Sequence, residues 1–138
     1  MNIVRAASRS TKQAPAKNFT GSVWQDELAV GAPPSRLRAT VVSFAPGART
    51  AWHTHAVHQV LYVLSGVGRL QKKGETLQVL RPGDTALIQA GELHWHGAAP
   101  DRLFAHISMV ENPEQGEATT WHEHVSDADY TAEPAPAA

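Results

Sequence analysis

The stretch GARTAWHTHAVHQVLYVLSG, residues 47–66, includes His53 and His55, which are separated by one residue. Successive side chains of a β-strand point to opposite faces of the sheet, so both imidazoles are expected on the same face. Gln59 has the same parity along the chain. Imidazole nitrogens together with a side-chain oxygen form a suitable ligand set for a divalent metal ion. The stretch therefore predicts strands that bring metal ligands together.

A second stretch, GDTALIQAGELHWHGA at residues 83–98, supplies a third candidate imidazole at His94. The predicted metal ligands are therefore His53, His55, Gln59 and His94. Three imidazoles and one amide oxygen leave positions open on an octahedral ion, which is typical of a reactive site rather than a structural one. Because Gln59 is neutral, the site would keep the full +2 charge, which favours Lewis-acid chemistry over oxygen activation.

Two further histidines are expected to face the barrel interior. His96 shares the parity of His94, and His106 lies on the last predicted core strand. A neutral histidine beside a cation can act as a general acid or base, so His106 and His96 are the catalytic candidates. The alternative for both is a supporting role, in which the ring orients a ligand or is a hydrogen-bonded core histidine. His58, which has the opposite parity to His55, is expected at the rim, and no metal site is expected at His122 and His124.

Short Val- and Thr-rich segments separated by Gly and Pro turns predict an all-β barrel or sandwich. Before residue 111 no segment has helical apolar spacing. We expect an N-terminal arm over residues 1–20 with a possible edge strand at residues 2–5, a barrel over 21–125, and a short helical turn with a disordered tail over 126–138. Trp52 and Trp95, opposite in parity to the ligands, are expected in core or interface packing.

The parity of the predicted strands also indicates a mostly apolar pocket. Such a pocket suits a small aromatic or aliphatic substrate. The expected lining residues are Thr40, Val42, Phe44, Leu61, Val63, Leu87, Phe104 and Val110.

Composition limits the class of protein. The chain has 138 residues, enough for one domain, and a net charge of −1, which does not favour nucleic acid or a membrane surface as a partner. It has no cysteine, hence no disulfide. No apolar run approaches the roughly 18 residues of a membrane span, and residues 1–10 lack the apolar core of a secretory signal. A cytoplasmic location is the default expectation.

The two-part pattern, G-x5-HxH-x3-Q-x6-G followed by G-x7-G-xx-H, closely resembles the two motifs of the cupins. This resemblance implies a single-domain cupin, a double-stranded β-helix or jelly-roll barrel. Three positions depart from the usual cupin pattern. Gln59 stands where most metal cupins have Glu, Gln89 replaces the usual Pro, and Ala98 replaces the usual Asn.

Longer stretches are similar to the bacterial cupin hydroxynitrile lyases, of the (R)-selective mandelonitrile lyase type. They are FAPGARTAWHTH at 44–55, GELHWHGAAP at 91–100 and WHEHVSDADY at 121–130, together with Gln59 and His106. The resemblance implies a metal-dependent lyase that cleaves or forms cyanohydrins from an aldehyde and HCN, with possible nitroaldol-type additions. It also implies manganese at the four ligands, a catalytic His106, activity-tuning pocket positions at Thr40, Val42 and Val110, and a homo-oligomer, either a dimer or a tetramer.

Other functions remain open from the sequence. Imidazole and oxygen ligands also suit Fe(II), Ni(II) or Zn(II). A metal-dependent cupin dioxygenase or isomerase acting on a small oxygenated compound is one alternative, and Gln59 counts against the dioxygenase. A non-catalytic cupin that binds a small molecule is the other, but it would not need histidines such as His96 and His106 facing the metal.

Overall fold

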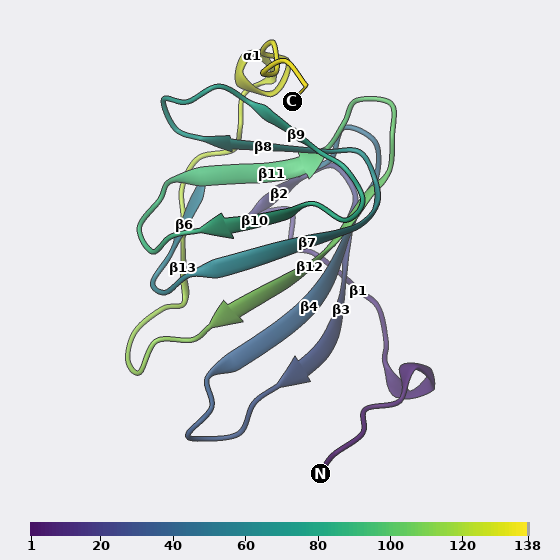
Figure 1. Ribbon diagram of the computed structural model, residues 1–138, viewed down its shortest axis with the longest axis vertical. Coiled ribbons are helices and arrows are strands. Elements are labelled where there is room, and N and C mark those ends of the chain that lie inside the picture. The colour runs from purple at the N-terminus through teal and green to yellow at the C-terminus, as the bar shows by residue number, and fades with distance from the viewer. Residues whose placement is uncertain (138) are drawn as a thin grey trace.

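The computed structural model describes residues 1–137, which form two antiparallel β-sheets and very little helix. Figure 1 shows the strands stacked from β3 and β4 at one side to β8 and β9 at the other. The first sheet has six strands in the order β1 (Lys12–Gln13), β3 (Val23–Val30), β4 (Leu37–Phe44), β12 (Phe104–Glu111), β7 (Gln59–Gly66) and β10 (Thr85–Ile88).

The second sheet has seven strands. Its main path runs through β13 (Thr119–Trp121), β6 (His53–His55), β11 (His94–Ala98), β5 (Arg49–Thr50) and β2 (Phe19–Thr20). Strand β8 (Gly68–Lys72) pairs with β11 and with β9 (Gln78–Leu80). The all-β fold expected from the sequence is therefore confirmed.

The main core lies between the two sheets. Val42, Phe44 and Phe104 of the first sheet pack in one cluster with Phe19 and Ala98 of the second. The strands alternate in burial as a half-buried sheet requires, because successive side chains point to opposite faces. On β7, for example, Gln59, Leu61 and Val63 are buried, whereas Tyr62 and Leu64 are exposed on the outer face.

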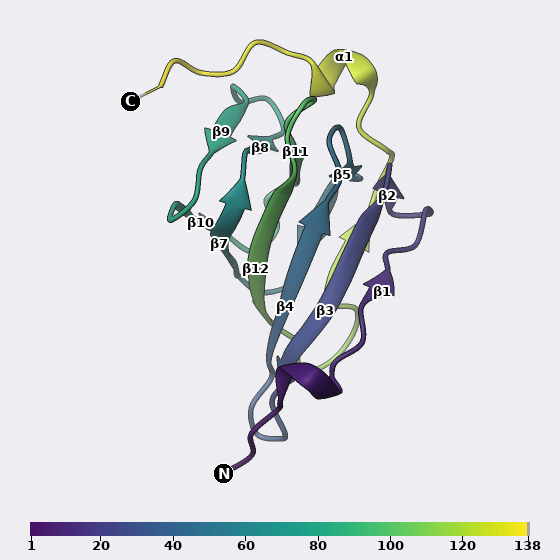
Figure 2. The ribbon, with the colours of Figure 1, turned by 90° about the vertical axis from the view of Figure 1, so that its right-hand side faces the viewer.

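The N-terminal arm differs from its predicted form. Residues 2–5 are not a strand, and a 3-10 helix, η1 (Ala6–Ser8), follows them. The edge strand is instead β1, whose Lys12 and Gln13 pair with Gln25 and Trp24 of β3. Figure 2 shows the arm lying beside β3, with η1 near one end of β3 and β4. Ile3 and Val4 stay exposed, and within the arm it is Lys12 and Gln13 that pair with β3.

The C-terminal segment is more ordered than predicted. Ser126 caps the short helix α1 (Asp127–Tyr130) by accepting a hydrogen bond from the Asp129 backbone, as the sequence indicated. The tail beyond α1 has no regular secondary structure, but the Ala135 backbone N–H donates to the Leu77 carbonyl at 2.8 Å, so the tail is held against the barrel. The last residue of the predicted disordered tail, 138, lies outside the described residues.

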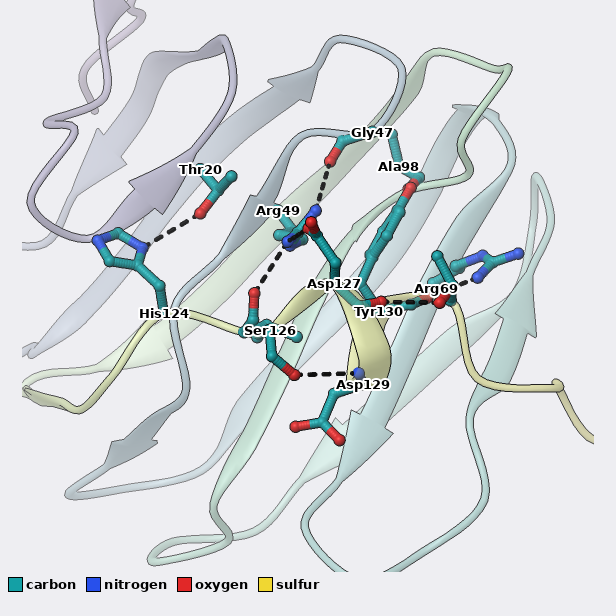
Figure 3. Close-up of polar contacts among 12 residues, drawn as sticks. Thr20, Gly47, Arg49, Arg69, Ala98, His124, Ser126, Asp127, Asp129 and Tyr130 are labelled. Carbon is teal, nitrogen blue, oxygen red and sulfur yellow. Dashed lines mark hydrogen bonds and ion pairs between the residues drawn. The ribbon is translucent and has the colours of Figure 1, made fainter.

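A cluster that we call the C-terminal clamp, formed by Arg49, Arg69, Asp127 and Tyr130, fixes this segment (Figure 3). The Arg49 guanidinium donates to the Val125 carbonyl at 2.9 Å and pairs with the Asp127 carboxylate at 3.0 Å. It also stacks 4.3 Å from the centre of the Tyr130 ring. The Tyr130 hydroxyl donates to the Ala98 carbonyl at 2.6 Å, and Arg69 donates to the Tyr130 carbonyl at 2.7 Å.

Beneath the clamp lies a second apolar cluster, in which Trp52 and Trp95 pack with Leu77, Val125 and Tyr130. The prediction of core packing for both tryptophans is confirmed, because neither is more than 2% exposed. Within residues 1–137 there is no helix long and apolar enough to cross a membrane.

Candidate metal centre

Imidazoles from three strands converge at one end of a cavity of about 550 Å³. Because His53 of β6 pairs directly with His94 of β11, their rings lie only 4.2 Å apart between centroids. The His55 ring lies 5.0 Å from that of His53, and the His96 ring lies 5.3 Å from it. All four histidines are buried. We call this group, with Gln59 and His106, the histidine centre.

Hydrogen bonds fix which ring nitrogen is free in two of these histidines. His53 Nδ1 lies 2.9 Å from the Ala51 carbonyl, and His94 Nδ1 lies 2.8 Å from the Glu92 carbonyl. A carbonyl oxygen only accepts, so each Nδ1 must carry the proton and each Nε2 must keep its lone pair. This arrangement is typical of metal-binding histidines, whose second ring nitrogen donates to an oxygen that orients the ring.

The other two sequence-predicted ligands also have a free acceptor. His55 Nδ1 contacts the Thr119 hydroxyl at 3.2 Å, and its Nε2 is buried without a partner. Gln59 Nε2 donates to Ser108 Oγ at 2.8 Å, and its Oε1 is likewise buried and unpaired. Since buried polar atoms are seldom left unpaired, these acceptors fit a site that holds a cation.

The tightest ligand triad differs in part from the predicted set. The ligand nitrogens of His53, His94 and His96 all lie within 4.8 Å of one another, so this buried group can hold a metal ion. His53 and His94 belong to both sets, while His55 and Gln59 line the same cavity. His96 was expected beside the metal on parity alone, but parity gives no distance and did not indicate that its Nε2 would come this close.

Burial keeps these imidazoles neutral. It lowers the pKa of His53 and His96 well below the usual value, and it lowers the pKa of His94 to a smaller degree. Burial and the neighbouring His94 together bring the pKa of His55 to about 4. At pH 7 the lone pairs are therefore available to a cation without the loss of a proton.

The two catalytic candidates contact each other. His106 Nε2 lies 3.1 Å from His96 Nδ1, so one ring donates a hydrogen bond to the other. His106 is fully buried, and burial lowers its pKa to about 4. The Phe44 and Phe104 rings pack against His106 at centroid distances of 5.6 and 5.4 Å. Both histidines line the cavity, so the pair can contact a molecule bound there.

The predicted pocket residues fall into three groups. Thr40, Val42 and Val110 line the cavity. Leu87 was placed in the pocket wrongly, because it is 62% exposed while its neighbour Ile88 faces inward and is buried. The remaining four are buried beneath the cavity and do not line it: Phe44, Leu61, Val63 and Phe104. His58 is exposed, as expected, and so are His122 and His124.

Two residues of β13 were missed by the sequence analysis. Strand β13 pairs with β6, opposite the two histidines of the HxH motif. Thr119 thereby reaches His55 Nδ1, and the Trp121 ring lies 4.7 Å from the His53 ring. The β-branched pair Thr119 and Thr120 was the available signal, but its partner strand was not indicated by the sequence.

The fold and site define the class: an all-β barrel protein with a buried group of imidazoles that can hold a metal ion. The chain belongs to the cupin family. The sequence model of the Cupin domain family matches residues 40–107 of this chain. A relative named (R)-mandelonitrile lyase, from Granulicella tundricola, is 42% identical over 130 residues, which cover 94% of this chain and 98% of that protein.

Solved structures agree with this assignment. A cupin-like protein from Thermotoga maritima matches with a TM-score of 0.81 at 34% identity, covering 86% of this chain and 89% of that chain. The polyketide cyclase RemF from Streptomyces resistomycificus matches with a TM-score of 0.71 at 18% identity, covering 94% of this chain and 90% of that chain, a likeness of fold alone.

Proposed function

We propose that this protein is a metal-dependent lyase that cleaves cyanohydrins to an aldehyde and HCN, or forms them in reverse. The observation that carries the proposal is the buried, neutral His96–His106 pair at 3.1 Å, beside acceptors suited to a cation. The relative named (R)-mandelonitrile lyase, at 42% identity over nearly the whole chain, supports the same reaction. A protein that only binds a small molecule does not need such a proton acceptor.

For the metal, we propose His53, His55, Gln59 and His94 as ligands, since each keeps a free acceptor or an oriented ring there. A bound divalent ion would supply Lewis-acid stabilisation of the negative charge that develops in the reaction. The proposed ion is Mn(II), with Fe(II), Ni(II) and Zn(II) as alternatives. Because Gln59 is neutral, the four side chains leave the charge of the ion undiminished.

The chain's own residues supply the proton transfer. The substituent of the cyanohydrin carbon lies against Val42 and Val110, and its hydroxyl faces the His96–His106 pair. His106 takes the hydroxyl proton, and His96 holds or relays it, while the C–C bond to the nitrile breaks. The bond electrons leave with cyanide, the carbonyl forms, and the pair returns the proton to give HCN. Neutral imidazoles are required to accept a proton at pH 7.

The test is cyanide release from racemic mandelonitrile by protein purified and reloaded with Mn(II). We expect His53→Ala to lose metal and activity together, and His106→Ala to keep metal but to lose activity by about 100-fold or more. His58→Ala, which removes an exposed histidine, is the matched control. No release from fully loaded protein would contradict the proposal, and oxygen-uptake assays of the iron form would then test the dioxygenase alternative.

We also propose a homo-oligomer, a dimer or a tetramer. The outer face of the six-stranded sheet exposes Trp24, Tyr62, Leu64 and Leu87, which lie on three of its strands. Apolar side chains gathered on one face favour self-association. Sedimentation of the protein against a Tyr62→Lys variant tests this assignment. The cytoplasmic location stays a prediction from the sequence.

A further inference from the structure

The cavity is larger than the histidine centre alone requires. Its volume of about 550 Å³ is of the size that encloses ligands larger than mandelonitrile. One end is lined by the histidines, and the other is lined by residues of the N-terminal arm and the ends of β3 and β4. The arm lies at that side of the barrel in Figure 2. The far end is therefore positioned to contact the part of a substrate remote from the reacting carbon.

The strand register shows how far the cavity extends along a line of residues that pair directly across β12, β4, β3 and β1. His106 pairs with Val42, and Val42 pairs with Gln25. Gln25 pairs in turn with Lys12 of the arm. Neighbouring strands lie about 4.8 Å apart, so three steps place the Lys12 backbone roughly 14 Å from that of His106. The side chains of this row share the inner face, and all four residues line the cavity.

A second line of paired residues, across β7, β12 and β4, ends at the positively charged Arg38. Gln59 pairs with Val110, and Val110 pairs with Arg38. By the same strand spacing, Arg38 lies roughly 10 Å from Gln59 at the backbone. Its guanidinium is 3.5 Å from the Glu27 carboxylate, so this positive charge is largely offset.

The other two positively charged side chains at the far end, those of Arg9 and Lys12, have no carboxylate paired with them within residues 1–137. Neither Arg9 nor Lys12 forms a salt bridge with any residue of the described part of the chain, 1–137. Arg9 donates to the Val4 carbonyl at 3.4 Å, but its Nε is buried without a partner. The far end therefore offers two uncompensated positive charges, one of which has a buried, unused donor. Such a site favours an anion, and a guanidinium in particular favours a carboxylate.

We propose that the substrate carries a carboxylate at the end remote from its reacting carbon, and that Arg9 and Lys12 bind this group. The part of the cavity next to the histidine centre, lined by Phe19, Val42 and Val110, suits an aromatic or aliphatic spacer. The substrate class is thus a carboxylated aldehyde and its cyanohydrin. This inference deepens the proposed lyase function and rests on it for the reaction, though not for the binding of the anion.

The kinetic test compares two aldehydes of equal length, 3-(4-formylphenyl)propanoate and its methyl ester, in cyanide addition by the Mn(II)-loaded protein. We expect kcat/KM to favour the acid by about tenfold. In the double variant Arg9→Gln/Lys12→Gln the acid-to-ester ratio should fall to about one. Lys17→Gln removes an exposed cation of the arm that does not line the cavity, and it should leave the ratio unchanged.

Calorimetric titration of the same two compounds separates this inference from the reaction. If neither aldehyde is converted, the lyase function fails, and tighter binding of the acid that is lost in the double variant still supports the anion site. Equal binding of acid and ester overturns it. So does an acid preference that survives in the double variant, because the carboxylate would then be held at the histidine centre.

Discussion

The barrel holds two polar clusters that differ in how their hydrogen bonds are used. In the C-terminal clamp, Arg49 donates to two carbonyls and one carboxylate, and the Tyr130 hydroxyl donates to a third carbonyl. Only the Nε atoms of Arg49 and Arg69 lack a partner there. In the histidine centre, five side chains each keep an unpaired buried atom: His55, Gln59, His94, His96 and His106.

The difference distinguishes a structural cluster from a functional one. A buried polar atom without a partner costs about 1–3 kcal/mol, so a group of them persists only where a ligand satisfies them. The clamp leaves two such atoms and directs its other donors to backbone carbonyls and one carboxylate. The unpaired atoms of the histidine centre lie beside a cavity, and their neutral rings are suited to a cation.

The largest expected effect is on the acid stability of the metal-free protein. Burial holds the pKa of His106 at about 4, below the 6.5 of the unfolded chain, so the unfolded state binds more protons between those values. Stability should be constant above pH 6.5 and should fall as pH drops toward 4. His106 alone accounts for roughly 3 kcal/mol, and the other buried imidazoles add to it. Thermal unfolding of metal-free protein across this range measures the loss.

Metal should oppose this loss, because protons and the ion compete for the same nitrogens. His124→Ala is the control, since His124 is exposed and its removal should leave the pH profile unchanged. A melting temperature that does not change between pH 6.5 and 4.5 in the metal-free protein would show that these imidazoles are not held neutral by the fold.

A smaller effect is expected from Gln59→Glu. The carboxylate places a negative charge beside the ion, so metal affinity should rise by about tenfold. The metal-free variant should be less stable, since the same carboxylate is then buried among neutral rings. Competition with a chromogenic chelator measures the affinity. Gln78→Glu, at an exposed position of β9, is the matched control, and unchanged affinity in Gln59→Glu would place Gln59 outside the ligand set.

The smallest effect is expected in the clamp. Tyr130→Phe removes the 2.6 Å hydrogen bond to the Ala98 carbonyl and should cost about 1 kcal/mol in the free energy of unfolding. Urea denaturation measures it, with Thr11→Val, which removes a hydroxyl at an exposed position of the N-terminal arm, as the control. Metal affinity should not change. A parallel loss of affinity would mean that the clamp also positions the ligands, and the two clusters would no longer be separable.

Much of the site was predictable because the two-residue period of a strand is fixed by backbone geometry. That period placed His53 and His55 on the same face of one strand before any tertiary contact was known. Gln59 lies on β7 of the other sheet and faces the same cavity. Leu87 was misplaced because both faces of Thr85–Ile88 carry apolar residues, so the pattern did not identify the inner face. The contact between His96 and His106 joins strands of the two different sheets, and those of Thr119 and Trp121 arise from the pairing of β13 with β6. No local pattern encodes either arrangement.

The pairing of β13 with β6 has a consequence for the order of events during synthesis. The HxH motif leaves the ribosome long before residues 119–121, yet those residues supply the neighbouring strand and the contacts to His53 and His55. A nascent chain that stops short of β13 has the ligand histidines without the strand that holds them in place. Loading with metal should therefore follow the pairing of β13 with β6 rather than the folding of the HxH strand alone.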